Sequence, residues 1–243
     1  MSVIDRFRYL RVTDVVDAMD GLGYFDIGLM DPAVRPLWLG MRFWGPALTV
    51  RCVPSNRPMW KLDTTQDIVD DHGHWYRRYP APVNIGKIGE MVTPGCVIVQ
   101  DVGASPETGY WGSNSALGMI ARGAVGIVTD GECRDTYEVC LQKTPVCCRS
   151  RARTIIPGRL MEVEANTVIA CGGVQVAPGD IVGCDDDGVV VVPQDLAEEV
   201  ATHAAAVLIA DMQGRRRLYE RLGLPMDETV NVQAVAAYYA QFG

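Results

Sequence analysis

The hydrophobic pattern of the chain predicts alternating strands and helices. Residues 46–53 alternate apolar and polar side chains, which is typical of a strand. Two short apolar runs, residues 96–100 and 125–129, are predicted to be buried strands. Residues 113–122 between them are helical in character, and Gly123 stands where a helix commonly ends. A strand, a helix and a strand in this order predict a βαβ element.

Both ends of the chain are predicted to contain helices. Residues 13–23 place apolar side chains on one side of a helix, with Thr13 as the expected N-cap. Glycine and proline turn signals divide residues 144–193 into a segment rich in short strands. An apolar helix is expected over residues 195–210, and broken helical segments over residues 211–243.

These elements predict one α/β domain over residues 1–210 with a C-terminal helical tail, residues 211–243. The length of 243 residues suits one large domain, at about 100–200 residues per domain. Residues 55–82 interrupt the pattern with an insertion rich in aromatic and charged side chains. The insertion is expected to be a substrate lid or a subunit contact, and the tail is expected to make contacts between subunits.

Composition and charge narrow the classes of function. The chain has 22 Lys+Arg and 30 Asp+Glu, a formal net charge of −8, so it repels a phosphate backbone and nucleic-acid binding is not expected. No apolar run approaches the roughly 18 residues of a membrane helix. The first residues show no signal-peptide core. We therefore expect a cytoplasmic protein with no membrane partner.

The eight cysteines form no C-x-x-C pair and are predicted to be small buried hydrophobic residues. Two nucleophilic alternatives stay open at this point. Cys133 is next to Arg134, and a neighbouring cation lowers the pKa of a thiol. Lys87 is the candidate for Schiff-base chemistry, because its sequence neighbours predict it to be the least exposed of the three lysines.

The strongest chemical signal lies around the predicted βαβ element. A glycine-containing loop, residues 109–114, opens the helix, and the first N–H groups of a helix form an anion site. Arg134 and Asp135 follow the next strand, and an arginine beside such N–H groups suits a carboxylate. Asp135, with Glu132 and Glu138 nearby, supplies oxygen ligands for Mg²⁺ or Mn²⁺. A carboxylate clamp with a divalent metal suits enolate chemistry on a 2-oxo acid.

Other interpretations of these and further motifs remain. Arg134 and Asp135 can equally form a solvated ion pair on a turn. His72 and His74 in the insertion are a candidate metal pair or part of a solvated loop. Residues 185–187 look like the start of a calcium loop but lack the glutamate at the twelfth position, so a tight turn is predicted.

The same region resembles the family that contains the regulator of ribonuclease activity A and the 4-hydroxy-4-methyl-2-oxoglutarate aldolases. The resemblance spans roughly residues 10–210, apart from the insertion. It is carried by Trp111-Gly112, residues 121–131, Arg134-Asp135, and residues 12–19, 45–50, 176–180 and 185–193. It implies a swivelling β/β/α-type fold, assembled as a homotrimer or homohexamer with sites between subunits.

The resemblance also implies roles for individual residues. Arg134 would hold the carboxylate and keto oxygen of a pyruvyl unit, Asp135 would anchor the metal, and N–H groups between Ser113 and Ala116 would hold the carboxylate from its other side. The family pattern has an acidic residue where this chain has Ser113, a weaker metal ligand, 20 residues before the Arg134-Asp135 pair. The expected site is then Arg134 and Asp135 for catalysis, Gly112, Ser113, Asn114, Ser115 and Arg134 for substrate binding, and Asp135 with Glu138 for the metal.

We therefore predict a divalent-metal-dependent carbon–carbon lyase that uses Mg²⁺ or Mn²⁺. It would form a pyruvate enolate from a 2-oxo acid, by retro-aldol cleavage or by decarboxylation. One alternative is a non-catalytic regulator that binds another protein, which the family resemblance also allows. Another is a different metal-assisted reaction of an oxo or hydroxy acid, with residues 55–82 reshaping the pocket.

Overall fold

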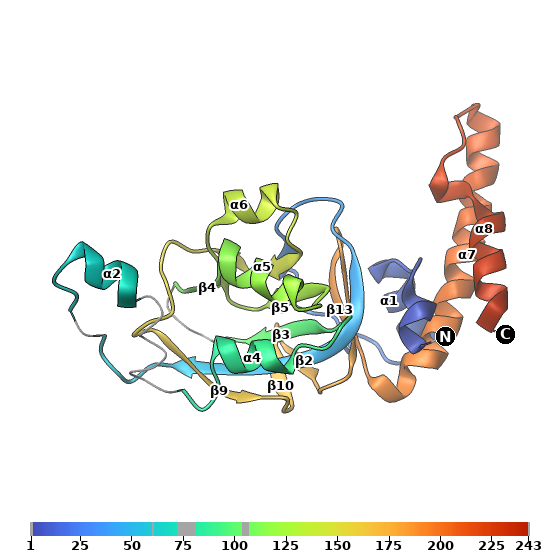
Figure 1. Ribbon diagram of the computed structural model, residues 1–243. Helices are drawn as coiled ribbons and strands as arrows, with labels where there is room; N and C mark the ends of the chain where they lie inside the picture. Colours follow the sequence, from blue (N-terminus) through green and yellow to red (C-terminus); the bar gives the residue numbers. More distant parts are fainter. Residues whose placement is uncertain (1, 60, 72–80, 104–106, 243) are drawn as a thin grey trace.

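A curved sheet of eight strands forms the centre of the computed structural model, which describes residues 2–59, 61–71, 81–103 and 107–242 (Figure 1). The strand order is β1 (Arg35–Pro36), β7 (Val146–Cys148), β5 (Gly126–Thr129), β3 (Val97–Asp101), β2 (Phe43–Pro54), β12 (Ile181–Asp185) and β13 (Gly188–Val192), with β9 (Leu160–Ala165) also paired to β2. The long strand β2 therefore joins a parallel half of the sheet to an antiparallel half. This arrangement confirms the expected α/β, swivelling β/β/α-type fold.

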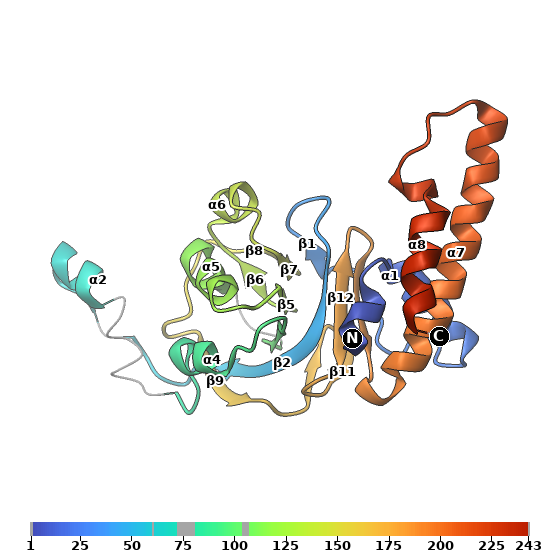
Figure 2. The same ribbon diagram turned by 45° about the vertical axis from the view of Figure 1, so that its right-hand side comes forward.

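The parallel half contains the predicted βαβ element. Strands β2, β3, β5 and β7 pair in parallel. The helices of this half are α4 (Ile85–Met91), α5 (Ser113–Ala121) and α6 (Thr136–Leu141), and they lie on one side of the sheet (Figures 1 and 2). Helix α5 starts at the predicted residue, and Gly123 beyond its end has a φ of +115°, a conformation that favours glycine. The predicted strand–helix–strand order is thus confirmed.

Two small sheets complete the strands. The first contains β4 (Gly109–Trp111), β6 (Glu132–Cys133) and β8 (Ser150–Arg151), all parallel, and the second is the hairpin of β10 (Ile169–Cys171) and β11 (Val174–Val176). Strand β4 leads directly into α5, and β6 leads into the turn before α6. Pairing of β4 with β6 therefore places the starts of these two helices side by side.

The two ends of the chain pack against each other. The N-terminal elements are η1 (Val3–Phe7) and α1 (Val12–Gly21), and the C-terminal ones are η2 (Gln194–Leu196), α7 (Ala197–Leu222), η3 (Glu228–Val230), α8 (Val232–Tyr239) and η4 (Ala240–Phe242). Val200, Ala204 and Leu208 of α7 are buried at helical spacing in one core with α1. Helix α7 runs unbroken through residues 210 and 211, the predicted boundary of the tail. It ends at Leu222, Gly223 follows with a φ of +66°, and α8 lies back along α7 (Figure 2).

The start of α1 corrects the sequence prediction. The helix begins at Val12, so Arg11 rather than Thr13 is the N-cap residue. The Asp14 carboxylate accepts the Arg11 backbone N–H at 2.9 Å and the Arg11 Nε at 3.0 Å. Asp14 is fully buried, and a buried charge needs such a partner. The bond to Asp14 raises the pKa of Arg11, which also binds Asp211 of α7 at 2.9 Å.

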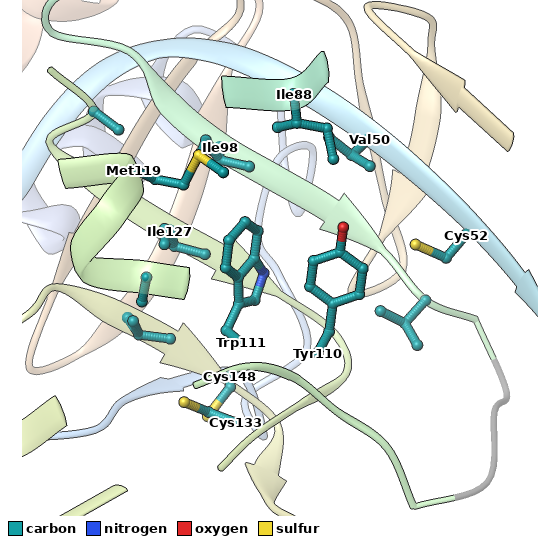
Figure 3. Packing of buried hydrophobic residues seen from close by; sticks show 14 of the residues in the cluster. Val50, Cys52, Ile88, Ile98, Tyr110, Trp111, Met119, Ile127, Cys133 and Cys148 are labelled. Carbon is teal, nitrogen blue, oxygen red and sulfur yellow. The ribbon is translucent and has the colours of Figure 1, made fainter. Parts of the chain in front are cut away.

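Buried apolar side chains form the core beneath α4, α5 and α6. Figure 3 shows Trp111 and Tyr110 at its centre, with ring centroids 4.9 Å apart. Seven of the eight cysteines are buried and Cys140 is partly buried, and all eight are free thiols, which confirms their prediction as buried hydrophobic residues. No helix in the described part of the chain is long and apolar enough to cross a membrane.

The insertion contains helix α2 (Thr65–Asp71), which extends away from the sheet in Figure 1. His72 and His74, the candidate metal pair, lie outside the described residues. The acidic run at residues 185–187 is the predicted tight turn, because β12 and β13 pair directly on either side of it and Gly188 has a φ of +130°.

Candidate active site

A cavity of about 460 Å³ opens between α4, α5 and the turn that precedes α6. Its volume suits a small organic ligand. Four of the residues that were expected to bind substrate line it: Gly112, Asn114, Ser115 and Arg134. Asp135, the expected metal ligand, lines it too, so the structure brings these predicted residues together.

Arg134 and Asp135 are held at the end of β6. The Arg134 backbone N–H donates to the Trp111 carbonyl at 2.8 Å, which ties this turn to the end of β4. The Arg134 Nε donates to Asp135 Oδ1 at 3.2 Å, and the two side chains are 31% and 34% exposed. Asp135 Oδ2 accepts the Ser113 backbone N–H at 3.2 Å. Asp135 therefore connects the arginine to the start of α5.

Two glycines allow this close approach. A Cβ atom on Gly112 would lie 2.6 Å from Asp135 Oδ2, and one on Gly109 would lie 2.8 Å from Arg134 Cβ. Any other residue at either position would push the arginine or the aspartate away. Gly109 and Gly112 are therefore needed because the side chains of Arg134 and Asp135 occupy the space that a Cβ atom would fill.

Two N–H groups at the start of α5 are available for an anion. The Gly112 N–H donates to Ser115 Oγ at 3.0 Å, the Ser113 N–H donates to Asp135, and the Ala116 N–H donates to the Gly112 carbonyl at 2.9 Å. Within the described residues, the N–H groups of Asn114 and Ser115 have no such partner. Of the N–H groups expected to bind an anion between Ser113 and Ala116, only those of Asn114 and Ser115 are therefore free, and both residues line the cavity.

The other predicted acids do not join Asp135. Glu132 accepts hydrogen bonds from the Thr108 N–H at 2.8 Å and the Ser150 hydroxyl at 2.9 Å. Glu138 is exposed, and it is not among the described residues that line the cavity. No group of three histidine, cysteine or acidic residues within the described parts of the chain could hold a metal ion. Asp135 is therefore the one carboxylate among the described lining residues.

Both nucleophilic alternatives are wrong. The Cys133 thiol is fully buried and donates to the Arg134 carbonyl at 3.3 Å. Burial raises the pKa of Cys133, the opposite of the expected effect of its charged neighbour. Lys87 is exposed, and its Nζ donates to the Pro82 carbonyl at 2.9 Å instead of facing the cavity.

The sequence pattern missed one buried acid close to the cavity. Glu162 on β9 is 2% exposed, and it accepts the hydroxyl of Tyr110, a cavity-lining residue, at 2.6 Å. Burial raises the pKa of Glu162, and the hydrogen bond from Tyr110 opposes this rise. Folding therefore makes this carboxyl group harder to ionise than it is in the unfolded chain.

Glu162→Gln is expected to remove a pH dependence of stability. An acid with a raised pKa stabilises the folded state fully below its unfolded pKa, near 4.5, and this contribution is lost as pH rises through the folded value. We expect the stability of the glutamine variant, relative to wild type, to be higher at pH 8 than at pH 5. Urea unfolding at both pH values measures this, with Glu164→Gln on the same strand as control, because the side chain of Glu164 is 44% exposed and pairs with Arg51. The prediction would be contradicted if the difference in unfolding free energy between Glu162→Gln and wild type were the same at pH 5 and pH 8.

The fold is that of an α/β protein, and its cavity is lined by an arginine, an aspartate and the first turn of a helix. The chain belongs to the RraA-like family, described as Aldolase/RraA, which matches residues 12–191. This confirms the resemblance seen in the sequence.

Three known proteins are similar to this chain. A protein of Halalkalibacterium halodurans, named as a candidate 4-hydroxy-4-methyl-2-oxoglutarate aldolase, is 28% identical over 98% of this chain and 94% of its own length. Protein DlpA of Legionella pneumophila is 24% identical over 82% of this chain, which spans only 28% of DlpA. The crystal structure of Streptomyces coelicolor RraAS2, described as an unusual member of the RNase ES inhibitor RraA family, is 26% identical. The structural match covers 88% of this chain and 97% of the RraAS2 chain, with a TM-score of 0.70.

Proposed function

We propose that this protein is a carbon–carbon lyase that cleaves the C3–C4 bond of a 2-oxo acid and releases pyruvate, by retro-aldol cleavage or by decarboxylation. The observation that supports this most is the shared cavity. Arg134, the free N–H groups of Asn114 and Ser115, and the Asp135 carboxylate all line it. The aldolase name of the Halalkalibacterium halodurans relative agrees with this chemistry.

The residues of this chain would bind the substrate carboxylate from two sides. Asp135 engages Nε of Arg134, so the terminal nitrogens of the guanidinium remain to donate to the carboxylate and the keto oxygen. The N–H groups of Asn114 and Ser115 would donate from the other side. In retro-aldol cleavage the C4 hydroxyl loses its proton to water as the C3–C4 bond breaks, and the C4 fragment leaves as a carbonyl compound; in decarboxylation C4 leaves as CO₂. In both cases the electron pair of the broken bond forms an enolate, and negative charge develops on the keto oxygen, where Arg134 stabilises it. A proton then adds to C3, and pyruvate leaves.

Asp135 is the residue that would hold Mg²⁺ or Mn²⁺. Its Oδ1 accepts the Nε–H of Arg134, and its Oδ2 accepts the backbone N–H and, at 3.5 Å, the hydroxyl of Ser113. This leaves a lone pair free on Oδ1 of a side chain that is one third exposed. Mg²⁺ keeps several waters and needs only one or two protein carboxylates, so this donor set fits it. Once bound, the cation would act as a Lewis acid toward the keto oxygen of the substrate.

Ser113→Asp is expected to tighten Mn²⁺ binding by about tenfold. Ser113 Oγ lies 3.5 Å from Asp135 Oδ2, so an aspartate at this position would bring a second carboxylate beside the first. Two carboxylates share a cation, and without the cation they repel each other. Paramagnetic resonance of free Mn²⁺ during titration measures the affinity, with Ser113→Asn as the neutral control. Equal affinities of the two variants would argue against a metal at Asp135.

The enolate-forming step is testable with pyruvate alone. Enolate protonation run in reverse removes a proton from the pyruvate methyl group, so deuterium should replace methyl hydrogens in D₂O. Proton NMR of pyruvate with the protein and Mg²⁺ follows this exchange, with EDTA and with Arg134→Ala as controls. Exchange that depends on the protein and on Arg134 supports the proposal, and exchange at the protein-free rate overturns it.

A homotrimer or homohexamer is part of the proposal. Leu117 on α5 and Tyr137 and Leu141 on α6 are 41%, 75% and 71% exposed beside the cavity. A second subunit on these helices would remove their apolar surface from water. Light scattering coupled to size-exclusion chromatography measures the assembly, and a monomer at micromolar concentration would contradict this part of the proposal.

A non-catalytic regulator that binds another protein is the second candidate. Ser113 in place of the family's acidic residue favours it, because this change leaves Asp135 as the one carboxylate among the described lining residues. The structural relative from Streptomyces coelicolor belongs to a family described as inhibitors of an RNase. This candidate predicts an intact oligomer without metal-dependent turnover.

A further inference from the structure

One face of α7 is exposed to solvent along the whole helix. The opposite face is buried in the core that α7 shares with α1 and α8. We call the exposed face the α7 stripe. Its residues recur at helical spacing, and all of them are exposed: Glu199, His203, Ala206, Ala210, Gln213, Arg217 and Arg221. The helix also stands well apart from α5 and α6 (Figures 1 and 2), so a partner on the stripe would leave the cavity free.

The two ends of the α7 stripe carry opposite charges. Glu199, with Glu198 beside it, makes the first turn of the helix negative, and Arg217 and Arg221 make its last turns positive. No salt bridge among the described residues engages Glu199, Arg217 or Arg221. Two parallel copies of this helix would bring like charges together, whereas two antiparallel copies would bring each acidic end to a basic end. The stripe is therefore complementary to itself in the antiparallel orientation.

Ala210 is the centre of this charge pattern. Glu199 and Arg221 stand eleven residues before and after it, which is close to three helical turns, so these residues share one face. Ala206 and Gly214 stand four residues before and after it. A two-fold axis beside Ala210 would place each Glu199 opposite Arg221 of a second copy. The small residues around the axis would let the two helices approach closely.

The residues seven positions from the centre match as well. His203 Nδ1 lies 2.9 Å from the Glu199 carbonyl oxygen, so Nδ1 is the donor of this bond and Nε2 of the neutral ring is an acceptor. The antiparallel pair would bring this acceptor to Arg217, which supplies donors. Leu218 follows Arg217 at the edge of the stripe and is exposed, so a second copy would also remove apolar surface from water.

We propose that the α7 stripe binds the α7 stripe of a second copy of this chain, in an antiparallel, two-fold symmetric contact centred on Ala210. Such a contact closes on itself, because each copy offers the same surface. It is separate from the exposed apolar residues of α5 and α6 beside the cavity. Joined to a trimer formed by those helices, the contact makes a hexamer, and without that trimer it makes a dimer. Neither outcome depends on the lyase activity.

Charge reversal tests the antiparallel pairing. Arg221→Glu puts like charges opposite each other at both ends of the contact, so light scattering coupled to size-exclusion chromatography should give half the wild-type mass. Glu199→Arg should halve the mass in the same way. A protein with both changes has opposite charges again and should regain the wild-type mass. Arg216→Glu is the matched control and should keep that mass, because Arg216 lies on the same helix outside the stripe, 3.1 Å from Glu220.

A cysteine at the axis tests the register. The native thiols are poorly accessible, since seven cysteines are buried and Cys140 is partly buried. Ala210→Cys should form a disulfide between two copies with oxidised glutathione, because the new thiol faces its own symmetry mate. Ala237→Cys, at an exposed position on α8, is the control and should not form one. Electrophoresis without reductant measures the crosslinked fraction.

Three results would each overturn the proposal. The first is a wild-type mass for Arg221→Glu, and the second is a double variant that stays at half mass. The third is a crosslinked fraction for Ala210→Cys no greater than for Ala237→Cys. Because the readouts are mass and crosslinking, a protein without lyase turnover is tested equally well.

Discussion

Replacing Arg134 with alanine is expected to lower kcat/KM for pyruvate release by about 10²- to 10³-fold, the usual effect of removing a donor that faces developing negative charge. Arg134 contacts both the substrate carboxylate and the keto oxygen in the proposed mechanism. Its side chain is 31% exposed, so its removal should leave the fold and the assembly intact. Arg134→Lys should restore only part of the activity, because an ammonium group cannot form the paired hydrogen bonds of a guanidinium.

Steady-state kinetics together with light scattering measures this outcome. Arg151→Ala is the control, since Arg151 is an exposed arginine on β8 of the same small sheet. Turnover by Arg134→Ala at the wild-type rate would show that catalysis does not take place in this cavity.

Gly112→Ala is expected to lower kcat/KM by about 10²-fold while the protein stays folded. The new Cβ atom would lie 2.6 Å from Asp135 Oδ2, and the carboxylate is the end of a side chain that can move away. Moving it breaks the hydrogen bond from the Ser113 N–H and shifts the partner of Arg134. The backbone angles of Gly112, φ −128° and ψ 178°, suit any residue, so the cost falls on the site and not on the fold.

Gly214→Ala is the matched control for this substitution. Gly214 lies inside α7, and its added Cβ would meet only Arg217 Nη2, at 3.8 Å. Alanine should stabilise the helix there by about 0.5–1 kcal/mol and leave turnover unchanged. If Gly112→Ala turned over substrate at the wild-type rate, the position of Asp135 would not limit the reaction.

The parts of the fold that were predicted correctly are those set by local pattern. The strands around residues 96–100 and 125–129 and helix α5 follow from apolar periodicity and from Gly123 at the end of the helix. The N-cap of α1 was mispredicted because the deciding group is the carboxylate of Asp14, two residues inside the helix, and not the hydroxyl of Thr13.

Strand β9 shows why burial was harder to predict than secondary structure. Its buried positions are Leu160 and Glu162, while Met161 and Val163 are only partly buried. Alternation alone would place Met161 and Val163 on the buried face of the strand and Glu162 on the exposed face. Glu162 is buried because its strand pairs with β2 and because Tyr110 donates to its carboxylate.

The candidate site was predictable only where its residues are neighbours in sequence. Arg134 and Asp135 stand together on one turn, and the loop that opens α5 is a recognisable anion site. Arg122 looks in the sequence like an ordinary cation at the end of a helix, where it complements the helix dipole. In the structure it lines the cavity, with its side chain beside Gly89 of α4.

The most direct test of the proposed lyase is pyruvate release from oxaloacetate and from 4-hydroxy-4-methyl-2-oxoglutarate. Each substrate is assayed with Mg²⁺, with Mn²⁺ and with EDTA, against a reaction without protein. A metal-dependent lyase should release pyruvate faster than the protein-free reaction, and EDTA should abolish this release. No release with either metal, from protein shown by light scattering to be assembled, would contradict the lyase and favour the regulator.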